Sequence, residues 1–148
     1  MAELKTLSII IKGDLHRIFE AWSNFDRFPT FMESVKSVEK MDDQMSHWKV
    51  KGPLGKTIEW NSITTRIDRD QRIAWTSDER GDIKTSGQVT FAELPNQETQ
   101  LTVTIKVQPL AGLATPVVEK LVGRLDTRLE RGLRDFKEHI EASTRRDR

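Results

Sequence analysis

The chain has no cysteine and no tyrosine among its 148 residues. Without cysteine it forms neither a disulfide framework nor a thiolate metal site, which fits a reducing compartment, so we expect a cytoplasmic protein. The longest apolar run, at residues 9–11, falls far short of the roughly 20 residues that span a bilayer. Residues 1–5 lack the basic region and apolar core of a signal peptide. These absences favour a globular protein with an ordinary hydrophobic core.

An excess of one charge is missing too, since 24 Lys and Arg stand against 23 Asp and Glu. Mixed signs argue against DNA as a partner and make RNA or a ribosome an unfavoured one. A local basic patch could form at Arg124, Arg128, Arg131 and Arg134. These residues spread around a helix, however, which argues against a common patch. The length predicts one domain over residues 1–148 and leaves the oligomeric state open.

Recognisable catalytic chemistry is also sparse. The three histidines, His16, His47 and His139, are scattered, and no pair has the spacing of metal ligands. No phosphate-binding glycine loop, nucleophile elbow or zinc motif occurs. We therefore predict no metal, no cofactor and no identifiable catalytic residue.

The most prominent feature present is an amphipathic stretch at residues 115–142. Its apolar residues recur at steps of three and four, which predicts one stripe along a helix roughly 40 Å long. Thr115 is the expected N-cap, with Pro116 at the first helical position. The stripe consists of Val118, Leu121, Val122, Leu125, Leu129, Leu133, Phe136 and Ile140. Such a helix needs a large apolar partner surface.

The preceding residues predict a sheet. Residues 4–11 read as a strand, followed by a short helix at 15–22 capped by Asp14 and a second from Ser23 that Pro29 disturbs or ends. Six runs of period two follow, and the short turns between them predict an antiparallel meander. These runs are residues 34–40, 46–51, 56–67, 72–77, 82–91 and 99–107. The C-terminal helix is expected to cover one face.

The third meander strand is irregular. Ile58 and Trp60 fall on the same face under strict strand alternation, whereas Ile63 and Ile67 fall on the other. This change predicts a bulge near Asn61 and Ser62. In the strand before it, His47 alternates with Trp48 and is expected to face away from the helix.

Three stretches carry a resemblance to a known superfamily: residues 19–32, residues 48–60, and residues 72–77 together with 87–91. With the element order, they resemble the START (SRPBCC) superfamily, in particular polyketide cyclase/dehydrase-like domains of the helix-grip fold. The resemblance implies an α+β fold in which a curved seven-stranded antiparallel sheet grips a long C-terminal helix. Members include lipid carriers, coenzyme Q-binding proteins, ribosome-association toxins and aromatic polyketide cyclases.

The resemblance also implies a hydrophobic cavity between sheet and helix. We expect its lining to include Trp48, Ile58, Trp60, Trp75, Val89, Phe91, Val103, Leu121, Leu125, Leu129, Gly132 and Phe31. If the bulge turns Glu59 or Asn61 inward, either is a candidate polar anchor. The tryptophans could line a ligand site or simply pack in the core, and the sequence leaves both open. Gly132 could leave room for a ligand or be a plain tolerated glycine.

Two functions from different classes follow. The first is non-catalytic binding or carriage of a hydrophobic small molecule such as a lipid, quinone or polyketide-like compound. The alternative is a cyclase/dehydratase-type enzyme using Glu59, Asn61, Arg66 or His139. A ribosome- or protein-interaction module is a weaker third. Lys51 and Lys56 flank the turn at 52–55 and suit an anion, with a solvated hairpin as the plainer interpretation.

Overall fold

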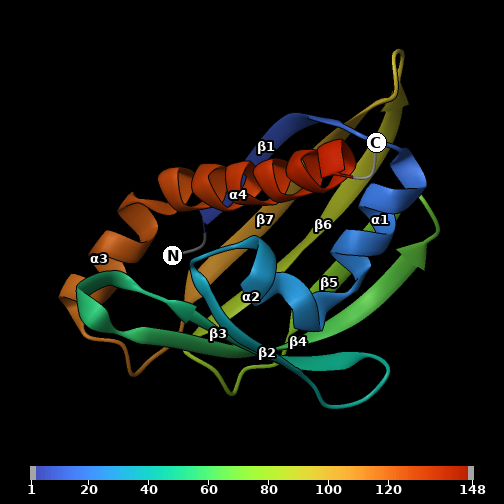
Figure 1. Cartoon of the computed structure of the whole chain (residues 1–148). Helices are drawn as coiled ribbons and strands as arrows, with labels where there is room; N and C mark the ends of the chain where they lie inside the picture. Colours follow the sequence, from blue (N-terminus) through green and yellow to red (C-terminus); the bar gives the residue numbers. More distant parts are fainter. Residues whose placement is uncertain (1–2, 147–148) are drawn as a thin grey trace.

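The structure is a computed structural model that describes residues 3–146 and shows a curled sheet with helices on its concave side (Figure 1). The elements are β1 (Glu3–Lys12), α1 (Leu15–Ser23), η1 (Phe25–Arg27), α2 (Phe28–Phe31), β2 (Val35–Lys40), β3 (Met45–Lys51), η2 (Pro53–Gly55), β4 (Thr57–Asp68), β5 (Arg72–Ser77), β6 (Ile83–Leu94), β7 (Glu98–Pro109), α3 (Thr115–Gly123) and α4 (Leu125–Arg146). Both η elements are short 3₁₀ turns. The order of strands and helices agrees with the predicted one.

Within residues 3–146, seven strands form one antiparallel sheet in the order β1-β7-β6-β5-β4-β3-β2. From β2 to β7 each strand pairs with the next in the chain, because the connecting turns are too short for crossovers. β1 completes the row beside β7. The sheet curls around α4 (Figure 1), which confirms the predicted α+β helix-grip architecture.

The first helix begins as predicted, and the second differs. The Asp14 carboxylate accepts a hydrogen bond from the Arg17 backbone N–H at 3.2 Å and caps α1. The chain then makes the η1 turn, and Pro29 lies in the first turn of α2. Proline is accepted there because that N–H has no helical partner. The prediction that the second helix begins from Ser23 and that Pro29 disturbs or ends it is therefore wrong, because Ser23 belongs to α1 and Pro29 lies within α2.

The predicted single helix at 115–142 is two helices. Arg124 separates α3 from α4 with φ −116° and ψ 16°, outside helical geometry. Ala114, rather than Thr115, occupies the N-cap position. Gly123, the last residue of α3, has low helix propensity, which favours a break at this point. The break turns α3 away from the axis of α4 (Figure 1).

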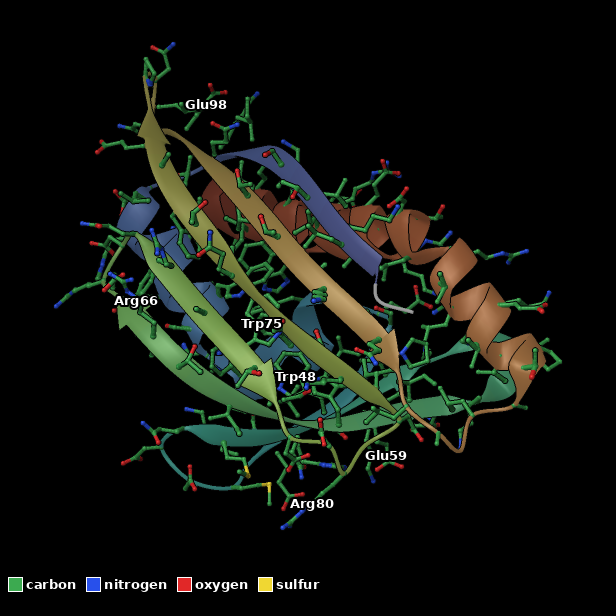
Figure 2. The ribbon with its side chains drawn as sticks, turned by 180° about the vertical axis from the view of Figure 1, so that it is seen from behind. Trp48, Glu59, Arg66, Trp75, Arg80 and Glu98 are labelled. Carbon is green, nitrogen blue, oxygen red and sulfur yellow. The ribbon has the colours of Figure 1, made fainter. Side chains whose placement is uncertain are left out.

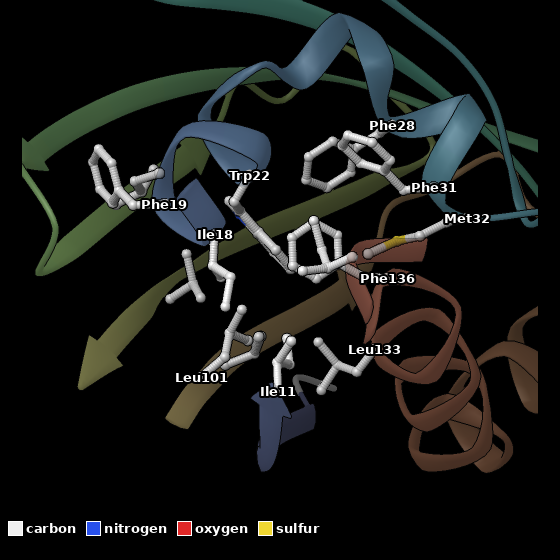
Figure 3. Packing of buried hydrophobic residues seen from close by; sticks show 14 of the residues in the cluster. Ile11, Ile18, Phe19, Trp22, Phe28, Phe31, Met32, Leu101, Leu133 and Phe136 are labelled. Carbon is white, nitrogen blue, oxygen red and sulfur yellow. The ribbon is translucent and has the colours of Figure 1, made fainter. Parts of the chain in front are cut away.

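Buried apolar side chains within the described residues form two clusters. The larger joins β1, α1, α2 and the C-terminal half of α4 (Figure 3). In it Trp22 meets Phe136 edge to face at 5.0 Å between ring centroids, and Phe28 likewise at 5.1 Å. The smaller cluster lies where α3 and the start of α4 meet the sheet, and consists of Ile58, Ile83, Val107, Val117, Leu121 and Leu125. The candidate site lies between the two.

Candidate functional site

A cavity of about 240 Å³ lies between the concave face of the sheet and α4. Its walls come from β2 to β7, from the short helices and from the α3–α4 segment. The lining is mostly apolar and aromatic, with a few hydroxyl and cationic groups. This composition is typical of small-molecule sites, although the volume is slightly below their usual range of about 300–1,000 Å³.

Most of the predicted lining residues surround this cavity. The structure places nine of them on its wall: Trp48, Ile58, Trp60, Trp75, Val103, Leu121, Leu125, Leu129 and Gly132. Whether these residues touch a ligand stays a prediction.

Three predicted residues lie elsewhere, in the larger cluster. Val89 and Phe91 are buried near the α1 end of the sheet, where Phe91 meets Phe19 at 5.2 Å. Phe31 packs against Phe136 at 5.4 Å between ring centroids. The expectation that these three line the cavity is wrong, because the short helices fill that end of the hollow.

The tryptophans both line the cavity and pack against neighbours. Trp48 and Trp60, opposite each other on β3 and β4, stack with centroids 5.8 Å apart and planes at 10°. Trp75 faces Gly87 across β5 and β6. Trp48 and Trp75 lie in the hollow of the sheet (Figure 2). The sequence left lining and packing open, and these side chains do both.

Gly87 creates the space in which Trp75 lies. A Cβ at this position would stand 2.2 Å from the Thr104 carbonyl oxygen and 3.0 Å from Trp75 Cζ2. Only glycine lets the two strands and the indole approach this closely.

Gly132 sits on the α4 wall of the cavity. A Cβ there would meet the Met32 sulfur at 3.4 Å, an ordinary contact distance. Part of the space beside this glycine is thus occupied by Met32, which also lines the cavity.

Glu59 and Asn61 do not reach the cavity. His47 Nε2 donates to Glu59 Oε1 at 2.9 Å, and Nδ1 donates to Asn61 Oδ1 at 2.7 Å. Asn61 Nδ2 donates to Asp78 Oδ2 at 2.9 Å, which fixes the orientation of the amide. The network lies on the convex face, where His47 was expected. The prediction that Glu59 or Asn61 anchors a ligand inside the cavity is wrong.

The position of the bulge explains this error. The register between β4 and β5 shifts between Thr64 and Arg66, not near Asn61. Alternation therefore continues up to Thr64, so Ser62 and Thr64 point inward and Ile63 points outward. Beyond the shift Ile67 pairs with the buried Ile73, but Ile67 itself is 57% exposed.

The convex network contains three groups with a shifted pKa: His47, Glu59 and Asp78. The hydrogen bonds that His47 donates to Asn61 and Glu59 raise the pKa of His47, because only the imidazolium can donate to both acceptors. The hydrogen bond from His47 in turn lowers the pKa of Glu59. The outer surface of β3 and β4 thus carries a charge-assisted pair.

A row of hydroxyl groups crosses the concave face. Four buried residues on β3 to β6 make up this row: Ser46, Ser62, Ser77 and Thr85. Ser62 pairs with Ser46 on one side and with Ser77 on the other. Thr85 follows on β6, next to the last cross-strand pair of β5 and β6. Trp48 Nε1 donates to Ser46 Oγ at 2.9 Å. Sequence reasoning missed this row, although Ser46 and Ser62 stand two residues from the inward Trp48 and Trp60.

Arg128 is the other residue that sequence reasoning missed. Its Nη1 donates to the Lys51 carbonyl oxygen at 2.8 Å, and both residues line the cavity. Burial, followed by the charges of Arg124 and Arg131, lowers the pKa of the Arg128 guanidinium. The spacing gave an indication: Arg128 stands four residues before the inward Gly132. Since Arg128 enters the cavity wall, the four arginines form no common patch.

The remaining ionisable candidates lie away from the cavity. Arg66 pairs with Asp68 at 2.7 Å between Nε and Oδ2. His139 packs against Phe31, with ring centroids 4.7 Å apart. The predicted proton-transfer roles of Arg66, His139, Glu59 and Asn61 in this cavity are therefore contradicted by their positions.

Two features are absent from residues 3–146. No helix in this part of the chain is long and apolar enough to cross a membrane. No group of His, Asp and Glu side chains within it is arranged to hold a metal ion.

Known proteins share this architecture. A START superfamily protein from Mycobacterium smegmatis aligns with 93% of the chain and 98% of its own length, at TM-score 0.72 and 17% identity. An aromatase/cyclase from Streptomyces sp. R1128 aligns with 100% of the chain and 97% of its own length, at TM-score 0.79 and 18% identity. At these identities the likeness is one of fold.

Similarity in sequence identifies the family. An uncharacterised 17.2 kDa protein of Streptomyces lincolnensis is 29% identical over 134 residues, which cover 90% of this chain and 87% of that protein. Residues 11–134 match the model of the family described as polyketide cyclase/dehydrase and lipid transport. This match and the fold confirm the resemblance inferred from the motifs: the chain belongs to the polyketide cyclase/dehydrase and lipid transport family.

Proposed function

We propose that the protein binds and carries a hydrophobic small molecule, such as a lipid, a quinone or a polyketide-like compound, between the sheet and α4. The observation that carries this proposal is the apolar cavity of about 240 Å³. Water occupies about 30 Å³ per molecule in the liquid. Protein interiors hold few voids larger than one water, so a space of this size in a chain of 148 residues supports a binding role.

The chemistry of the lining favours carriage over catalysis. Among the described residues on the cavity wall there is no Asp, Glu, His, Cys or Tyr. General acid–base catalysis uses a group that titrates near the working pH, and neither arginine nor an ordinary lysine does so. The hydroxyl row and Arg128 can orient a ligand but do not form a nucleophile–base pair.

A cyclase/dehydratase-type enzyme is the second candidate. It draws support from the family's description and from the likeness to an aromatase/cyclase along the full chain. In that case the cavity would template ring closure. Formation of an aromatic product from a linear poly-β-keto thioester would favour this candidate over carriage.

Ligand binding is tested by filling the cavity. Displacement of the neutral dye N-phenylnaphthylamine by fatty alcohols and quinones is expected for the natural chain, and native mass spectrometry should show a retained adduct. Gly132→Leu should abolish dye binding, because the new side chain enters the cavity beside Met32.

The matched control is Gly123→Leu. It makes the same change where a Cβ meets nothing within 4 Å, and dye binding should persist. Absence of both dye binding and adduct in the natural chain would refute the proposal.

A further inference from the structure

Among the side chains that the structure describes, two buried polar atoms lack a hydrogen-bond partner: Arg128 Nε and Thr85 Oγ1. Both residues line the same cavity. Buried polar groups in folded proteins nearly always have a partner. Their coincidence at one cavity indicates a partner that the chain itself does not supply.

Arg128 also lacks a counter-charge. No ion pair joins it to a carboxylate among the described residues, and the charges that act on it, Arg124 and Arg131, have its own sign. The one acceptor that it contacts is the neutral Lys51 carbonyl oxygen. A partly buried guanidinium is normally paired with an anion, so the cavity wall presents an unmatched positive charge.

The geometry of the guanidinium selects the kind of anion. Nη1 is engaged by the Lys51 carbonyl. The Nε–H stands on the opposite edge of the guanidinium, beside Nη2. Two parallel N–H groups on such an edge match the two oxygens of a carboxylate. A phosphate can also pair with this edge, but the single positive charge of Arg128 is neutralised by one carboxylate.

The surroundings supply a place for an apolar tail. Leu125, Leu129 and Gly132 flank Arg128 on α4, and the Trp48–Trp60 stack forms part of the facing wall. Thr85 stands on β6, at the end of the hydroxyl row, with its Oγ1 unpartnered. Its backbone N–H donates to Ser77 Oγ at 2.8 Å. The tail therefore meets a largely apolar wall in which the buried Thr85 hydroxyl lacks a partner.

We propose that the ligand is an amphipathic carboxylic acid whose carboxylate pairs with Arg128 and whose tail carries an oxygen substituent that bonds to Thr85. This inference rests on the proposed function, because it names the chemical class of the molecule carried. It assigns the charged anchor that Glu59 and Asn61 do not provide.

Calorimetric titration of the full chain at neutral pH with decanoic acid, decanol and decyl phosphate tests the charged end. The natural chain is expected to bind decanoate at least about tenfold more tightly than decanol, as a charge-assisted hydrogen bond implies. Arg128→Met should erase this preference, so that decanoate binds no more tightly than decanol. Arg134→Met, the same change at an exposed position of α4, should leave both affinities unchanged.

The outcomes separate this inference from the proposed function. Equal affinity for decanoate and decanol, or a preference that survives in Arg128→Met, overturns the carboxylate anchor while the proposed function stands. Stronger binding of decyl phosphate than of decanoate also overturns it. Binding of none of the three refutes both proposals. If Arg128→Met does not fold, Arg128→Lys is the second variant. It keeps the positive charge but lacks the two parallel N–H groups, so it should weaken decanoate binding more than decanol binding.

The second end has its own test. Among hydroxydecanoic acids with the hydroxyl at successive carbons, at least one should bind the natural chain more tightly than decanoic acid. Thr85→Val, which removes the hydroxyl and keeps the shape, should erase that gain. A series in which no isomer gains affinity, or a gain unchanged by Thr85→Val, overturns the assignment to Thr85.

Discussion

The two halves of α4 have different surroundings. Around the C-terminal half of α4, aromatic rings interlock, and Phe136 is fully buried against Trp22 and Phe31 (Figure 3). Around its N-terminal half, Leu125 and Leu129 face the cavity. We call these the packed half and the hollow half. The difference indicates that one end of the hollow supplies stability so that the other can remain open, since an open space forgoes dispersion contacts.

The largest expected effect is on the free energy of unfolding, and it tests whether the two halves of α4 differ in packing. Phe136→Ala should lower the free energy of unfolding by about 3–5 kcal/mol, the cost typical of a large core truncation. Leu129→Ala, at a wall that already faces empty space, should cost less than about 2 kcal/mol. Urea unfolding of both variants measures the difference. Equal losses would mean that the two halves are packed alike.

Gly87→Ala tests how closely the sheet must approach Trp75. The new Cβ would stand 2.2 Å from the Thr104 carbonyl oxygen, so a strand must move. We expect a loss of about 1–3 kcal/mol in the free energy of unfolding, as for overpacked sites, and altered Trp fluorescence. Unchanged stability and fluorescence would show that the hollow half deforms freely.

Gly132→Ala tests where the packed half of α4 ends and the hollow half begins. Because the added methyl meets Met32 at an ordinary distance, the gain in helix propensity should raise stability by up to about 1 kcal/mol. Dye affinity should fall, since the methyl occupies the cavity wall. In the control Gly123→Ala, dye affinity should not change. A loss of stability in Gly132→Ala would mean that the packed half extends to this residue.

The smallest effect concerns pH and the outer surface of the hollow half. The raised pKa of His47 means that its stabilising contribution is complete below pH 6.5, the ordinary histidine value, and is lost as pH rises through the folded-state pKa. The lowered pKa of Glu59 makes its contribution present above its ordinary value and lost in acid. NMR titration of His47 checks this. Asn61→Ala should lower the His47 pKa, and an unchanged value would contradict the network.

Much of the fold could be predicted from the sequence because period-two patterning and short turns leave few topologies. The bounds of β5 agree with those of the predicted strand at 72–77. The break at Arg124 was missed because the apolar stripe continues across it in phase, although Gly123 is a local signal for it. Whether a helix bends there depends on contacts with the distant Ile58 and Val107, which a local pattern does not contain.

The site was predictable in its apolar part and not in its polar part. Trp48, Trp60 and Trp75 follow strand alternation, so their side of the sheet could be read directly. Glu59 was misplaced because the bulge lies a few residues later than expected. Arg128 was missed because a charged residue on an amphipathic helix is ordinarily solvated. Its inward position depends on the Lys51 carbonyl, 77 positions away in the chain.

The parallel indoles of Trp48 and Trp60 have an optical consequence. Aromatic chromophores stacked 5.8 Å apart and nearly parallel couple their electronic transitions, so their absorption and circular dichroism depend on mutual orientation. Both rings border the space assigned to a ligand, and an occupant that tilts either one alters the near-ultraviolet spectrum. The unlabelled chain thus carries its own spectroscopic reporter of whether the cavity is filled.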